Sequence, residues 1–101
     1  MPTLAMPPIC IPRAKYTTNV NQVRQVFEKL FGTDCVESID EKCITKQENT
    51  QSYKRYFIHF NQSLLTYPEN VRQRLINGNN INIVYEKPWI WKCSAANIHS
   101  N

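Results

Sequence analysis

One eight-residue segment, Tyr53–Phe60, limits what this chain can fold into more than any other part of the sequence. Side chains alternate between the two faces of a β-strand, and every second position here is apolar or aromatic: Tyr56, Ile58 and Phe60. The intervening positions carry a cation, an aromatic ring and an imidazole: Arg55, Phe57 and His59. The pattern therefore predicts a strand with one buried face and one face that presents charge and a ring to solvent.

Upstream of this segment the sequence predicts a short strand and a helix. Alternation over residues 9–11 indicates the strand, which we expect Pro12 to end. Asn19 is suited to cap the N-terminus of the helix, and Gly32 is suited to stop it in a left-handed conformation. The helix would bury one stripe of apolar residues at helical spacing: Val20, Val23, Val26, Phe27, Leu30 and Phe31. A second strand with a bulge or a bend is expected within residues 35–44.

Downstream the sequence predicts a second helix and a further strand. Residues 45–52 are polar throughout and indicate an exposed loop. Pro68 is suited to the first turn of a short helix, whose apolar side would be formed by Val71, Leu75 and Ile76. A turn over residues 77–80 leads to an alternating strand over residues 81–86. The element order βαββαβ is that of a ferredoxin-like α+β fold, with both helices on one face of the sheet.

A chain of 101 residues is long enough for one domain with its own core. We expect a flexible arm over residues 1–7, the domain over residues 8–86, and a tryptophan-containing extension over residues 87–101. The formal net charge of +4 mildly favours an anionic partner. Acidic residues crowd into residues 34–41, and we expect them at the edge of the sheet that lies away from the basic residues.

Several classes of function find no support in the sequence. No glycine-rich phosphate loop, zinc-ligand spacing or catalytic constellation is recognisable, so we expect neither an enzyme nor a bound cofactor or metal. The sequence has no run long enough to span a membrane and no pattern typical of a secretory signal. We therefore expect an intracellular protein whose cysteines are free thiols, although Cys10 and Cys93 would come close together if the extension folded back over the first strand.

The octapeptide and the element order together resemble the RNA recognition motif family. Against that family's octamer, YKRYFIHF matches in one exposed stacking position and two core positions: Phe57, Ile58 and Phe60. Four positions depart from the family's usual residues: Cys10, Lys54, Arg55 and Tyr56. The resemblance implies a four-stranded antiparallel sheet in the order 4-1-3-2, which binds single-stranded RNA on its helix-free face. Only one of the family's three exposed aromatic positions is kept.

A narrower resemblance rests on three segments, ICIPR, FIHF and VYEKPWIWKCSAA. Together they are similar to small RNA-recognition-like proteins encoded by giant DNA viruses. This resemblance implies a viral origin and a location in the host cytoplasm, the virus factory or the virion.

The aromatic candidates each have two interpretations. Phe57 would stack on a base, or it would pack beneath the C-terminal extension. Trp89 and Trp91 would form a lid that completes the core or caps the sheet, or they would be stacking platforms or an anchor for a partner protein. A large aromatic is more often buried than exposed, which favours the lid.

The polar candidates are cations and one histidine. Arg13, Lys54, Arg55 and Lys87 should fall on adjacent strands, where they would contact phosphates or form an ordinary solvated surface. His59 would hydrogen-bond a base or a phosphate, or would be a neutral surface histidine.

Two functions remain. The sequence favours modest binding of single-stranded nucleic acid, RNA before DNA, with little sequence preference. The alternative is a protein-interaction or virion-structural module, in which the extension covers the sheet face and the partner is another protein or a second copy of the chain.

Overall fold

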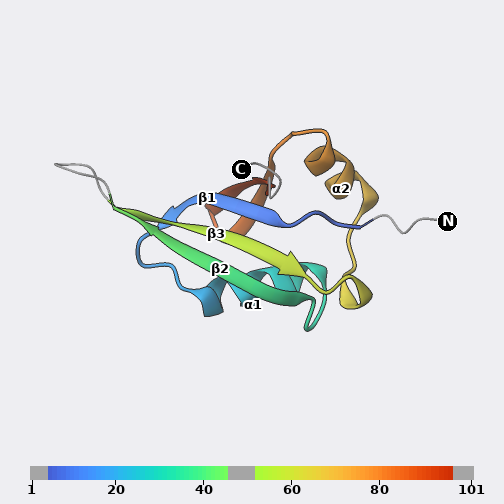
Figure 1. Cartoon of the computed structure of the whole chain (residues 1–101), viewed down its shortest axis with the longest axis horizontal. Helices are drawn as coiled ribbons and strands as arrows, with labels where there is room; N and C mark the ends of the chain where they lie inside the picture. Colours follow the sequence, from blue (N-terminus) through green and yellow to red (C-terminus); the bar gives the residue numbers. More distant parts are fainter. Residues whose placement is uncertain (1–4, 46–51, 97–101) are drawn as a thin grey trace.

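The computed structural model describes residues 5–45 and 52–96, which form an α+β fold with two α-helices and five strands (Figure 1). In chain order the elements are β1 (Ile9–Lys15), α1 (Val20–Phe31), β2 (Val36–Ile44), β3 (Tyr53–Phe60), the short 3-10 helix η1 (Gln62–Leu64), α2 (Glu69–Ile76), β4 (Ile81–Glu86) and β5 (Trp89–Ala95). The expected α+β class is confirmed, and the expected loop over residues 45–52 lies almost entirely outside the described residues.

The sheet is antiparallel, with the strand order β2-β3-β1-β5-β4. The four-stranded sheet in the order 4-1-3-2 is therefore wrong in detail. Residues 89–95, which we expected to lie beyond the domain, form a fifth strand that turns back from β4 at Lys87–Pro88 and pairs with β1. β5 occupies the place beside β1 that was expected for β4, and β4 moves to the edge.

Helix α1 begins and ends where its sequence signals predict. The Asn19 side chain accepts a hydrogen bond of 2.8 Å from the backbone N–H of Gln22, which satisfies one of the free donors of the first turn. Gly32 ends the helix with φ of 127°. A Cβ atom at this glycine would lie 2.7 Å from the backbone oxygen of Leu64, so the position requires glycine for its space as well as its conformation.

Register shifts in β1 and β2 decide which of their side chains reach each face of the sheet, and a further shift lies in β4 between Val84 and Glu86. β1 does not end at Pro12, because the pairing with β3 shifts between Ile11 and Ala14 and the strand continues to Lys15. A bulge leaves an extra residue unpaired, so a proline without an N–H is tolerated there. β2 contains the expected bulge, at the register shift between Val36 and Ser38.

The core lies between the sheet and the helices, and Trp91 is part of it. The indole of Trp91 is 2% exposed and stacks on Tyr85 at 4.4 Å and on Phe27 of α1 at 6.3 Å between ring centroids. Helix α2 adds Leu75 to the same core. Figure 1 shows α1 behind the strands, so Trp91 fills the helix-covered side and does not lie across the opposite face.

The N-terminal segment is fastened to the connection that follows β3. Met6 is 2% exposed. Its backbone N–H donates to the side chain of Gln62 at 3.0 Å, and its carbonyl accepts from the same side chain at 3.1 Å. Of the arm expected over residues 1–7, residues 1–4 lie outside the described part of the chain.

We predict that the two glycines with positive φ differ in their tolerance of alanine. Gly32→Ala should lower the free energy of unfolding by about 2 kcal/mol or more, because backbone strain adds to the clash with the Leu64 oxygen. Gly78→Ala is the matched control, with φ of 84° and nothing within 4 Å of the added Cβ; it should cost only about 1 kcal/mol. Urea denaturation measures both, and equal losses would contradict the packing argument.

The two tryptophans should also differ sharply. Trp91→Ala removes a buried ring from a stack of three and should cost about 3–5 kcal/mol of unfolding free energy. Trp89 is 52% exposed, so Trp89→Ala should change this free energy by less than about 1 kcal/mol. A large loss for Trp89→Ala in thermal or urea denaturation would show that it also supports the fold.

Candidate functional site

The face of the sheet opposite α1, called the open face below, carries the side chains that the octapeptide predicts for solvent. No helix or strand among the described residues crosses this face (Figure 1). Arg55, Phe57 and His59 are half-buried there, while Tyr56, Ile58 and Phe60 are buried on the helix side. The predicted division of β3 into two chemically different faces is therefore observed.

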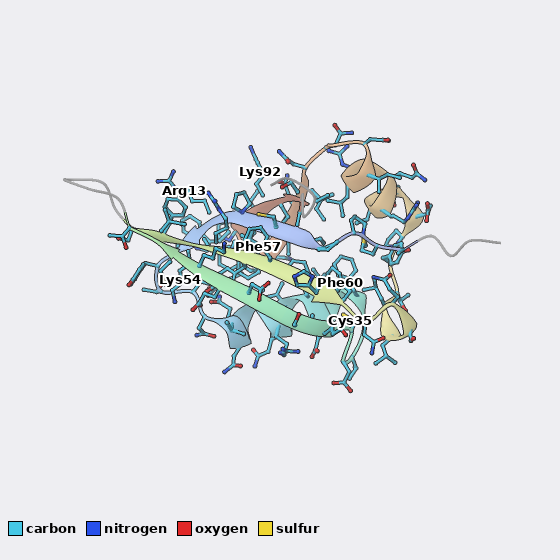
Figure 2. The ribbon with its side chains drawn as sticks, viewed as in Figure 1. Arg13, Cys35, Lys54, Phe57, Phe60 and Lys92 are labelled. Atoms are coloured by element: carbon cyan, nitrogen blue, oxygen red, sulfur yellow. The ribbon has the colours of Figure 1, made fainter. Side chains whose placement is uncertain are left out.

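Phe57 lies in the middle of the open face. Its cross-strand neighbours are Cys10 on β1 and Asp40 on β2. The Nζ atom of Lys42 lies 5.8 Å from the centroid of the ring, within the range of a cation–π contact. The centre of the open face therefore combines an aromatic ring, labelled in Figure 2, with a nearby cation.

Arg55 and Arg13 are each held by a local contact. Arg55 donates from Nε to the carbonyl of Pro12 at 3.3 Å, so its planar group is fixed against β1. The guanidinium carbon of Arg13 lies 4.7 Å from the centroid of the Tyr53 ring. These contacts are to a carbonyl and a ring, not to a carboxylate.

The strand register brings four cations into one line across the sheet, called the basic row below. Arg55 faces Lys42 on β2, and the bulge of β1 sets Pro12 and Arg13 against Arg55 on its other side. Cys10 pairs with Ser94, so two residues further along Lys92 is level with Pro12. The row has one residue on each of four strands: Lys42, Arg55, Arg13 and Lys92. Figure 2 labels Arg13 and Lys92.

Within the described part of the chain, no member of the basic row forms an ion pair with a carboxylate. Asp40 is a cross-strand neighbour of Phe57, and a carboxylate oxygen of Asp40 lies 3.3 Å from Nε2 of His59. The acidic segment lies on an edge strand, as expected, but the register of β2 against β3 places Asp40 directly beside Phe57. Asp40 and His59 close one side of Phe57, and the basic row borders the other.

Lys54 lies on the opposite side of the sheet from Phe57 and has structural partners. Its Nζ donates to the carbonyl of Thr18 at 2.6 Å and lies 3.4 Å from a carboxylate oxygen of Glu41. The hydroxyl of Tyr56 is placed between the same two acceptors, at 3.0 Å and 2.7 Å. Burial, reinforced by the hydrogen bond to Glu41, raises the pKa of Tyr56 well above its ordinary value. Lys54 thus compensates a half-buried carboxylate and is not part of the basic row.

The remaining sequence candidates are spread over the β4–β5 hairpin. Lys87 lies in its turn, outside the basic row. Trp89 is half-exposed, with the Nζ of Lys15 at 4.6 Å from its ring centroid, and Trp91 is in the core. Sequence reasoning missed Lys42 and Lys92. Lys42 could have been found from a strand register that counts the β2 bulge, but Lys92 becomes visible only when residues 89–95 are recognised as a strand.

All four cysteines are free thiols. Cys43 is exposed, and Cys35 and Cys93 are buried. Burial raises the pKa of Cys93 to about 12, and it also raises the pKa of Cys35 and of Cys10. Cys10 is half-buried beside Phe57, so the rate at which its thiol is modified measures how accessible the open face is.

This arrangement predicts an order of thiol reactivity. At about pH 8, where the thiolate is the reactive form, a thiol reagent should modify Cys43 fastest and Cys10 more slowly. Cys35 and Cys93 should react only on unfolding, because burial limits access and disfavours the thiolate. Cys43→Ser should remove the fastest phase and Cys93→Ser should leave it unchanged, as followed by mass spectrometry. Rapid modification of Cys93 in the folded protein would contradict the core described above.

The described residues contain no group of three or more histidine, cysteine or acidic side chains placed to hold a metal ion. Neither helix is long and apolar enough to cross a membrane, and the described residues contain no other α-helix. What the fold and the face define is a class: a small α+β protein with a five-stranded antiparallel sheet and a basic, ring-bearing open face. No protein-family profile matches the chain, and no curated protein or solved structure is significantly similar to it.

Proposed function

We propose that the open face binds single-stranded nucleic acid, RNA in preference to DNA, with modest affinity and little sequence preference. The observation that carries the proposal is the basic row beside the ring of Phe57, four cations that form no ion pair with a carboxylate of the described residues. Cations in a line neutralise successive phosphates, while a ring offers a platform on which any base stacks. Contacts to phosphates and stacking on a ring do not depend on base identity, which accounts for the expected lack of sequence preference.

The resemblance to the RNA recognition motif supports this proposal in a reduced form. The spatial sequence β2-β3-β1 is the same in both arrangements, and β5 here takes the fourth position. Phe57 stands at the family's exposed stacking position on the third strand. Arg55 and Cys10 stand where the family has its other two rings. One stacked base and a larger electrostatic contribution are therefore expected, in place of two or three stacked bases.

Binding driven by the basic row should weaken steeply with salt. Each phosphate neutralised on a single strand contributes a slope of about −0.7 to log K against log salt, so four contacts give about −2.8. Affinity for a fluorescently labelled oligo-U should fall about fifty-fold between about 50 and 200 mM salt. A mixed-sequence RNA should behave alike. Absence of binding, or binding that does not respond to salt, would falsify the proposal.

Two substitutions separate charge from stacking. Arg55→Ala should flatten the salt slope by about 0.7, the contribution of one phosphate contact. Phe57→Ala should lower affinity about tenfold at every salt concentration and leave the slope unchanged. Lys29→Ala, at an exposed site on α1, is the matched control and should alter neither quantity.

A thiol footprint locates the bound strand on the protein. Bound RNA should slow modification of Cys10, which neighbours Phe57. Cys43 pairs with Lys54 and lies on the other side of the sheet, so its rate should not change. Equal protection of both thiols, or protection of Cys43 alone, would place the RNA elsewhere.

Apolar side chains on the β4–β5 hairpin favour a second candidate, a protein-interaction module. Val84, Trp89 and Ile90 are each about half-exposed, and β4 is an edge strand. Exposed apolar groups along an unpaired edge are suited to pairing with another chain. Size-exclusion chromatography over a range of protein concentrations tests this candidate, since self-association through the hairpin should be abolished by Val84→Lys and be insensitive to Phe57→Ala.

A further inference from the structure

β1 and β5 separate beyond their short paired segment, and a cavity opens between them. Their pairing is confined to Ile9–Ala95 and Cys10–Ser94. Further along, β1 pairs only with β3, and β5 pairs only with β4. A cavity of about 670 Å³ lies in this divergent region. Its volume is in the range of sites that hold small organic ligands.

Among the described residues, the lining of this cavity carries positive charge and is rich in rings. Arg13 and Lys15 supply two cations, and no acidic residue of the described segments 5–45 and 52–96 contributes to the lining. Four aromatic side chains line it: Tyr16, Tyr53, Tyr85 and Trp91. Hydroxyl groups of Thr17 and Ser52 complete the polar part. A ligand that combines an anionic group with a flat aromatic ring would match both parts of this surface.

A buried donor without a partner lies in the same wall. The indole N–H of Trp91 is buried and has no acceptor among the described residues. Leaving such a group unpaired is costly in a folded protein. The face of the same indole is already stacked on Tyr85. The wall therefore contains a fixed aromatic stack, and the buried indole N–H belongs to one of its rings.

We propose that this cavity binds a single nucleotide, with its phosphate on Arg13 and Lys15 and its base against the rings of Tyr53 and Tyr85. Arg13 belongs both to the basic row and to the cavity, so the inference builds on the proposed function and adds a second site at one end of that row. The bound nucleotide is a free mononucleotide or the terminal nucleotide of a strand. The chemistry of recognition is the same for both.

NMR chemical-shift changes in the full chain test the inference with defined probes. The probes are uridine and adenosine 5′-monophosphates, the corresponding nucleosides and inorganic phosphate, each up to about 1 mM so that weak sites are seen. The monophosphates should shift the signals of Lys15, Tyr85 and the Trp91 indole N–H, and should bind at least about tenfold more tightly than the nucleosides or inorganic phosphate. Equal binding of inorganic phosphate, or no shift at these residues, overturns the inference.

Substitutions distinguish this site from the open face. Lys15→Ala should weaken mononucleotide binding about tenfold through loss of one phosphate contact. Lys42→Ala is the matched control, because it lies in the basic row but not in the cavity. It should flatten the salt slope for oligo-U and leave mononucleotide binding unchanged. Mononucleotide binding that is unchanged by Lys15→Ala contradicts the assignment of the phosphate to this cavity.

Two further comparisons distinguish a free mononucleotide from the end of a strand, and distinguish this inference from the proposed function. A linear and a circular oligonucleotide of the same length are compared. If only the linear one shifts the signals of the cavity residues, the cavity binds the end of a strand. Shifts with mononucleotides alone assign it to a free nucleotide. Salt-sensitive binding of oligo-U without any effect at the cavity overturns this inference and keeps the proposed function. Mononucleotide binding at the cavity without oligo-U binding supports this inference and overturns the proposed function.

Discussion

The stack of Phe27, Trp91 and Tyr85 is the interaction on which the rest of the structure depends. It joins α1 to both strands of the β4–β5 hairpin through three rings in the core. Burial of a large aromatic is among the largest single contributions that a side chain makes to a small core. Because Trp91 satisfies this burial on the helix side, β5 is drawn into the sheet, and the indole leaves the open face uncovered.

Local signals in the sequence were sufficient for α1 and β3. The Asn19 cap, the helical apolar stripe and Gly32 act within a few residues of each other, and the alternation of Tyr53–Phe60 is unbroken. β5 could not be assigned in the same way, since Pro88 interrupts the strand pattern and two tryptophans in a terminal segment indicate burial without indicating where. Its position is decided by pairing with β1 and by stacking on Phe27, both of which are long-range contacts.

The candidate site depended on register more than on composition. Simple alternation from Ile9 and Ile11 would place Arg13 in the core, but the bulge after Ile11 places it over Tyr53 on the open face. The bulge of β2 likewise places Asp40 beside Phe57. One inserted residue moves every following side chain to the other face. The residue types at the site were therefore predictable, whereas their grouping required the pairing of four strands.

The basic row has a consequence for the isolated protein. Like charges on directly opposed strand positions repel one another, which lowers the stability of the folded chain. Dissolved ions screen such repulsion between exposed groups. Moderate salt should therefore stabilise the fold while it weakens the proposed binding of a polyanion, so the conditions that best preserve the protein during purification are those under which the proposed ligand would be lost.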